Sequence, residues 1–204
     1  ASDGDKRQVH GDDIWEILFT SGTTARPKAV MVSHTSTYMA AYSHMLSMTR
    51  GLDHESEIRL ASFTPMVFHI GDHLCVFGPL VCGGTAIMGR KPEGHEMAEA
   101  CTRERATCLF GGSPQFVESL VTAVEERPFA YDLSSLTVMF FGWAPMAPGS
   151  LAAFRRLCNP KVRLYELIGQ TEAVACHRFF IDRHAEMYAR CLLYTSPSPR
   201  DPTK

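Results

Sequence analysis

Hydroxyl and basic side chains gather around one glycine near the start of the chain. Residues 19–30 read FTSGTTARPKAV. Gly22 lets the backbone approach an anion closely, the neighbouring hydroxyl groups can donate beside their N–H groups, and Lys28 adds a positive charge. Together these groups meet the requirements of a polyphosphate, although a polar hairpin stiffened by Pro27 is the plainer alternative. The candidate phosphate ligands are Thr20, Ser21, Gly22, Thr23, Thr24 and Lys28.

The loop does not match the two common nucleotide-binding patterns. A Walker A loop reads GxxxxGK[ST] and leads directly into a helix, whereas Lys28 here follows Pro27 and precedes an apolar strand-like run. The GxGxxG turn of dinucleotide-binding domains is also absent from the loop. The sequence therefore disfavours a P-loop NTPase and a Rossmann dehydrogenase.

A second group of candidate residues lies around two histidines. His69 and His73 are four residues apart with Asp72 between them, a spacing that could chelate zinc on a helix. The HExxH pattern is not matched and no third ligand is evident, so a structural pair of histidines is the favoured interpretation. Thr171 and Glu172, in the run YELIGQTEA, could act at a ligand or could cap the start of a helix.

Composition narrows the class of protein. The chain has 204 residues, 45% of them hydrophobic, and a net charge of −2, which leaves no basic footprint for nucleic acid. Three glycines and one proline interrupt the longest apolar stretch, residues 74–88, so no transmembrane segment is expected. The polar first residues lack the apolar core of a secretory signal, and the seven cysteines form no CxxC pair. A cytoplasmic protein that acts on small molecules is favoured.

Short apolar runs alternate with longer amphipathic runs, which is typical of an α/β layer architecture. Strands are expected at residues 14–20, 29–33, 59–63, 85–88, 136–141 and 162–168. Helices are expected at residues 35–48, 71–81, 113–127 and around 151–157. No internal repeat or linker is found, so these elements form one continuous piece.

Four segments in order resemble the adenylate-forming (AMP-binding) superfamily, which includes acyl-CoA synthetases, adenylation domains and luciferases. They are TSGTT with the following PK, then TPMVFHIG at 64–71, DLSSLTVMFFGWAPM at 132–146 and YELIGQTEA at 165–173. Three positions depart from the family pattern: Ala25 and Trp143 stand where glycine is usual, and Ile168 stands where an aromatic residue is usual. The resemblance implies an α/β fold, as an incomplete piece of the layered N-terminal domain of these enzymes.

The resemblance also implies an activity and residue roles. The reaction is ATP-dependent activation of a small-molecule carboxylic acid to an acyl-adenylate, followed by transfer to coenzyme A, with Mg²⁺ as the metal. The loop at 20–28 then binds the β- and γ-phosphates, Thr171 binds the α-phosphate and Glu172 binds Mg²⁺. The family places the adenine against a wall formed here by Gly142, Trp143, Ala144 and Pro145, and the nucleotide also lies near Gly169 and Gln170.

His69 falls at the position that lines the acyl pocket in this family. Relatives that activate amino acids usually carry Asp there, so a fatty or aryl acid is the favoured substrate. Two alternatives stay open. One is a noncatalytic nucleotide-binding module, and the other is a fatty-acyl-AMP ligase or adenylation domain that loads a carrier protein.

The end of the chain differs from the rest. The run CLLYTSPSPRD at 191–201 has no periodicity and resembles the translation of a transposon-end adapter used in sequencing libraries. We therefore expect a partial AMP-binding domain at residues 1–190 and a disordered, adapter-derived tail at 191–204. The family's ribose-binding Asp and its small C-terminal domain with a catalytic Lys are not found, so this fragment is expected to be inactive by itself.

Overall fold

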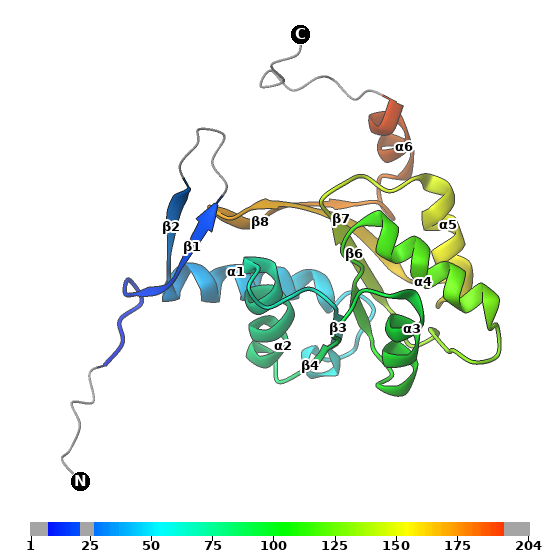
Figure 1. Ribbon diagram of the computed structural model, residues 1–204, viewed down its shortest axis with the longest axis horizontal. Helices are drawn as coiled ribbons and strands as arrows, with labels where there is room; N and C mark the ends of the chain where they lie inside the picture. The colour runs from blue at the N-terminus through cyan, green and yellow to red at the C-terminus, as the bar shows by residue number, and fades with distance from the viewer. Residues whose placement is uncertain (1–7, 21–26, 194–204) are drawn as a thin grey trace.

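The computed structural model describes residues 8–20 and 27–193 (Figure 1). Its centre is a six-stranded sheet in the order β4-β3-β5-β6-β7-β8, and a separate hairpin pairs β1 with β2. The strands are β1 (Ile14–Thr20), β2 (Lys28–Ser33), β3 (Arg59–Ser62), β4 (Thr85–Met88), β5 (Cys108–Phe110), β6 (Val138–Gly142), β7 (Arg163–Gln170) and β8 (Ala173–Phe180). Strands β3 to β7 run parallel and β8 is antiparallel to β7, so the expected α/β class is confirmed.

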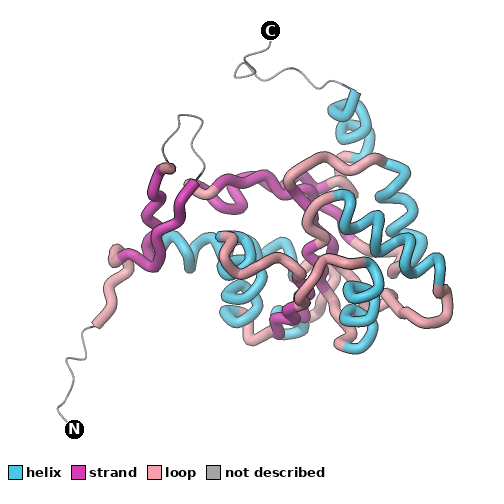
Figure 2. Tube along the Cα trace, viewed as in Figure 1, coloured by secondary structure: helices cyan, strands magenta, loops and turns pink. Residues whose placement is uncertain are grey.

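Helices cover both faces of the sheet (Figure 2). One face packs against α1 (His34–Met48) and the π-helix η2 (Ile70–Phe77), which continues into α2 (Gly78–Val81). The other face packs against α3 (Gly94–Arg103), α4 (Pro114–Glu126), α5 (Pro148–Leu157) and α6 (Ala185–Leu193). A short 3₁₀ turn, η1 (Glu55–Glu57), precedes β3.

Side chains along the central strands alternate between two hydrophobic cores. Met139 and Phe141 of β6 lie in the core under α3, α4 and α5, whereas Val138 and Phe140 lie in the core under α1 and η2. This period of two is the geometry of a strand that is buried on both faces. Phe140 stacks on Phe110 at 4.7 Å and on Tyr165 at 5.4 Å between ring centroids, so aromatic contacts tie the three central strands together.

The π-helix explains how the expected helix at residues 71–81 is built. Its eight residues carry Gly71, Leu74 and Cys75 into the core, and Pro79 then occupies an early position of α2. The π-helical stretch places His69, at its N-terminal boundary, next to His73, with ring centroids 4.0 Å apart.

The turn after β7 differs from the sequence expectation, and the last helix lies at the expected end of the domain. Residues 171–172 form the turn between β7 and β8, so the capped helix start considered for Thr171 and Glu172 is wrong. Helix α6 crosses the boundary expected at residue 190 and ends at Leu193, and residues 194–204 of the expected tail lie outside the described part. No helix among the described residues is long and apolar enough to cross a membrane.

Candidate active site

A cavity of about 780 Å³ opens beside the carboxyl ends of β3, β5, β6 and β7. In open parallel sheets, ligands bind in the crevice outside this edge. The cavity brings together eight of the residues predicted as site residues, from three segments that are far apart in the sequence. They are His69, Gly142, Trp143, Ala144, Pro145, Gly169, Gln170 and Thr171.

The segment after β6 forms one wall of the cavity. Gly142 lies so close to β7 that a Cβ on it would come within 2.8 Å of the Leu167 carbonyl oxygen, so only glycine fits there without a shift. The next residue, Trp143, has a φ of 65°, in the left-handed region that favours glycine. Its ring packs edge-on against Phe110 at 5.7 Å and remains 59% exposed. Trp143 therefore lines the cavity as a largely exposed residue, at the cost of backbone strain.

The end of β7 and the turn after it form the adjoining wall. Gly169, Gln170 and Thr171 line the cavity, and the backbone carbonyl of Thr171 accepts a hydrogen bond of 3.1 Å from His69 Nδ1. Glu172, the predicted Mg²⁺ ligand, follows directly at the turn and its side chain is exposed. Gly142 of β6 pairs with Leu167 of β7, so these two walls belong to neighbouring strands.

The β1–β2 hairpin carries the predicted phosphate ligands. Thr20 and Lys28 are the last pair of its register, so they stand opposite each other where the two strands meet the loop. Lys28 is exposed and Thr20 is half-buried. The other predicted phosphate ligands, Ser21, Gly22, Thr23 and Thr24, lie outside the described residues.

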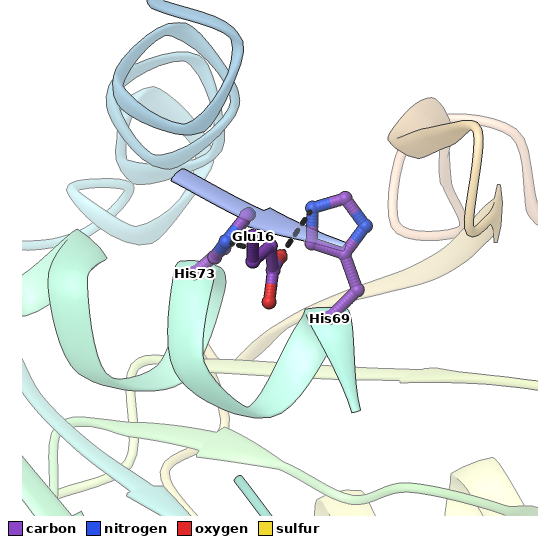
Figure 3. A group of neighbouring side chains, drawn as sticks. All are labelled: Glu16, His69 and His73. Atoms are coloured by element: carbon purple, nitrogen blue, oxygen red, sulfur yellow. Dashed lines mark ion pairs between the residues drawn. The ribbon is translucent and has the colours of Figure 1, made fainter. Parts of the chain in front are cut away.

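Strand β1 contacts His69 of the cavity wall through Glu16. Figure 3 shows its carboxylate between His69 and His73, 3.6 Å from Nε2 of the first and 2.8 Å from Nε2 of the second. Burial is the main cause of three shifted pKa values here: it lowers the pKa of His69, lowers that of His73 to about 3 and raises that of Glu16. Asp72 beside them has its pKa raised to about 6, again mainly by burial. The sequence expectation that no third group joins the two histidines is therefore wrong.

Sequence reasoning also missed two charged residues of the cavity wall. Glu166 of β7 faces the cavity from the sheet, and burial raises the pKa of its carboxyl group while a hydrogen bond from Tyr188 acts in the other direction. Arg90, which follows β4, also lines the cavity. Neither position has a local sequence signal, because only the order of the strands brings it to the cavity.

Comparison with known proteins agrees with this geometry. A family model described as "AMP-binding enzyme" matches residues 2–194. The chain belongs to the AMP-binding enzyme family. The resemblance seen in the four sequence segments is thereby confirmed, and so is the fold as part of the N-terminal domain of adenylate-forming enzymes.

Curated and solved relatives of this family support the assignment. The chain is 32% identical over 169 residues to peroxisomal OPC-8:0-CoA ligase 1 of Arabidopsis thaliana, covering 82% of the chain and 30% of the ligase. It is 31% identical over 165 residues to tyrocidine synthase 3 of Brevibacillus parabrevis, covering 79% of the chain and 2% of the synthase. The luciferase-like enzyme of the Zophobas morio mealworm has a TM-score of 0.71 at 25% identity over 89% of the chain and 40% of that enzyme. The chain thus spans under half the length of these relatives.

Proposed function

We propose that this chain supplies the nucleotide- and acid-binding cavity for ATP-dependent activation of a carboxylic acid. The observation that supports this most strongly is the convergence of residues 142–145, residues 169–171 and His69 on one cavity. A volume of about 780 Å³ is within the usual range for small-molecule sites, roughly 300–1,000 Å³. In the reaction the substrate carboxylate attacks the α-phosphorus of ATP, pyrophosphate leaves, and the acyl-adenylate then passes its acyl group to coenzyme A.

Each wall has its own part in the proposal. The residues from Gly142 to Pro145 hold the adenine, with Trp143 offering its exposed ring face for stacking. Thr171 donates its hydroxyl group toward the α-phosphate, and the loop from Thr20 to Lys28 binds the outer phosphates. Such preorganised donors stabilise the charge that develops on the phosphorus oxygens.

Glu172 is the proposed ligand for Mg²⁺. Its exposed carboxylate follows Thr171 at the turn, and magnesium sites commonly combine one or two carboxylates with waters and substrate phosphates. When bound, Mg²⁺ neutralises part of the negative charge on the phosphates.

The proposed acid is a fatty or aryl acid. Aromatic and aliphatic side chains line much of the cavity, and they are Phe63, Phe68, Ile70, Phe110 and Phe116. An acid with an ammonium group is the second candidate, because the Glu166 carboxyl group lines the same cavity. Burial raises the pKa of Glu166, which weakens it as a partner for that ammonium.

Stable acyl-sulfamoyl adenosines, which mimic the acyl-adenylate, test this proposal in the 204-residue chain. The variant Trp15→Phe leaves Trp143 as the sole tryptophan, since the chain has two. We expect saturable quenching of its fluorescence by the decanoyl or benzoyl compound, with an affinity at least about tenfold higher than for the leucyl compound, a difference of about 1.4 kcal/mol. A leucyl preference would favour amino-acid activation, and no saturable response to any compound would overturn the proposal.

A matched pair of threonine variants shows whether loss of a hydroxyl group weakens analogue binding only when the hydroxyl group lies in the cavity. Thr171→Val removes a hydroxyl group on the cavity wall, whereas Thr122→Val removes an exposed one that donates to the Glu118 carbonyl within α4. Only the first should weaken analogue binding. Mixed with ATP, Mg²⁺ and decanoate, the chain is expected to release no pyrophosphate, because it covers only 30% of the Arabidopsis ligase.

A further inference from the structure

Glu16, His69 and His73 bring three metal-binding side chains to one point, and nothing in acid activation requires this cluster. One ligand atom from each residue lies within 4.8 Å of the others. Figure 3 shows the three side chains converging; Glu16 comes from β1, His69 from the N-terminal boundary of the π-helix η2 and His73 from its first turn. We propose that this cluster is a binding site for a divalent transition-metal ion, with Zn²⁺ as the ion that fits it best.

The distances suit a tetrahedral ion. Ligand atoms about 2.0–2.1 Å from zinc at tetrahedral angles lie about 3.3 Å from each other. The two measured separations, 2.8 Å from Glu16 Oε1 to His73 Nε2 and 3.6 Å to His69 Nε2, lie on either side of this value. Two histidines and one glutamate leave the fourth position of zinc open to water.

The hydrogen bonds around the cluster leave two of its three ligand atoms without another partner, whereas Thr37 Oγ1 lies 3.5 Å from the third, His73 Nε2. His69 donates through Nδ1 to the Thr171 carbonyl, which directs the lone pair of its Nε2 toward Glu16. This outer hydrogen bond is the arrangement that orients a metal-binding histidine. His69 Nε2 and Glu16 Oε1 are both buried without a hydrogen-bond partner, and the His73 side chain is completely buried.

Charge gives an independent reason for a cation. Glu16 and Asp72 place two carboxyl groups beside the two imidazoles, with Glu16 Oε1 2.8 Å and Asp72 Oδ2 3.5 Å from His73 Nε2. Within the described part of the chain, the ion-pair partners of Glu16 and Asp72 are these histidines alone. Buried charge without a partner is costly, and a divalent ion would supply the missing positive charge.

Co²⁺ and Zn²⁺ titrations of the full 204-residue chain test the site. After removal of metals with a chelator, the chain should bind one equivalent of Co²⁺ with the intense visible bands of four-coordinate cobalt. It should show no thiolate charge-transfer band, because no cysteine belongs to the cluster. Zn²⁺ should displace the cobalt and raise the thermal midpoint of unfolding. No binding, or a thiolate band, would overturn the proposal.

Single-ligand variants locate the ion. Glu16→Gln and His69→Gln should each weaken Zn²⁺ binding by about tenfold or more in a competition assay against a chromophoric chelator. The matched control is His95→Gln, which removes a partly exposed histidine outside the cluster, 3.3 Å from Glu126, and it should bind like the parent chain. Circular dichroism identifies any variant that fails to fold. The Zn²⁺ affinity of the variant that does fold then decides whether the site exists. Unchanged affinity in a folded ligand variant rejects the site. The proposal does not depend on the acyl-adenylate experiment, so either can fail alone.

Discussion

At the position of Trp143, we expect a glycine variant to be more stable than an alanine variant, which is the reverse of the usual order. Its φ of 65° lies in the left-handed region, where an L-residue is less stable by about 1–2 kcal/mol. Alanine at this position keeps that strain, whereas glycine removes it. Glycine in turn costs about 0.4–1 kcal/mol because it makes the unfolded chain more flexible. We therefore expect Trp143→Gly to be more stable than Trp143→Ala by about 0.8 kcal/mol, taking the middle of both ranges.

Thermal unfolding of both variants, followed by far-ultraviolet circular dichroism, measures this difference. For a chain of this size, about 0.8 kcal/mol corresponds to a midpoint roughly 2–3 °C higher for the glycine variant. Gly149 in the first turn of α5 is the control, because a Cβ there meets nothing within 4 Å and its φ is not in the left-handed region. Gly149→Ala should raise the midpoint. A Trp143→Ala variant as stable as Trp143→Gly would show that the backbone there is not strained.

The parent tryptophan should differ little in stability from the glycine variant. Removing the indole loses the edge-on contact with Phe110, worth about 0.5–1.5 kcal/mol, but also relieves the backbone strain. Binding of the acyl-sulfamoyl adenosine, in contrast, should weaken when the exposed ring face is lost, and calorimetry can measure this without a tryptophan. The strained position is therefore expected to matter for the ligand more than for the fold.

Three other predictions concern the packing, the acid sensitivity and the surface of the chain. Gly94→Ala should lower the thermal midpoint, because the new Cβ would come within 2.1 Å of the Ser119 carbonyl oxygen of α4; a midpoint as high as that of Gly149→Ala would contradict the close approach. Burial, with nearby Arg178, lowers the pKa of His44 from about 6.5 to about 3, so the unfolded chain takes up a proton between these values and the folded chain does not. Through this group, the free energy of unfolding should fall by about 1.4 kcal/mol per pH unit below pH 6.5. Urea titrations at pH 7 and pH 5 should therefore show a smaller loss of this free energy for His44→Leu than for the parent chain. An equal loss would refute the assignment. On α1, Leu46 and three neighbouring apolar side chains are about half exposed or more. We expect the chain to self-associate through this surface. Light scattering should then show less association for Leu46→Lys.

Most strands of the central sheet were predictable because each is marked by its own short run of apolar residues. Parallel strands buried on both faces are short apolar runs, and each of β3, β4, β6 and β7 overlaps an expected strand. Strand β5 has only three residues, and α3 carries a largely polar sequence whose buried face depends on Met97 and Cys101, so both were missed. Strand β8 includes His177 and Arg178, and its place at the edge of the sheet follows from the turn at 171–172 rather than from an apolar run.

The cavity residues were predicted for a different reason. Residues 142–145 and 169–171 were found through family motifs, and the structure brings them together because β6 and β7 are neighbours in the sheet. Glu16 could not be found in this way. It is a single acidic residue in the apolar run IWEILFT, and only the packing of β1 against η2 places it beside His69 and His73. The roles of all these residues in binding stay predictions.

His69 connects the cavity to the three-residue cluster, and its hydrogen bonds limit what it can do in the cavity. Its Nδ1 donates to the Thr171 carbonyl and its Nε2 faces Glu16, so both ring nitrogens are directed to the protein. A general base needs a nitrogen within hydrogen-bond reach of the substrate proton. We therefore expect His69 to present an imidazole ring of fixed orientation to the cavity, and not to act as a general base. The same two contacts join β1, and with it Thr20 and Lys28, to the turn that carries Thr171 and Glu172. A metal ion at Glu16 would strengthen this connection without touching the substrate.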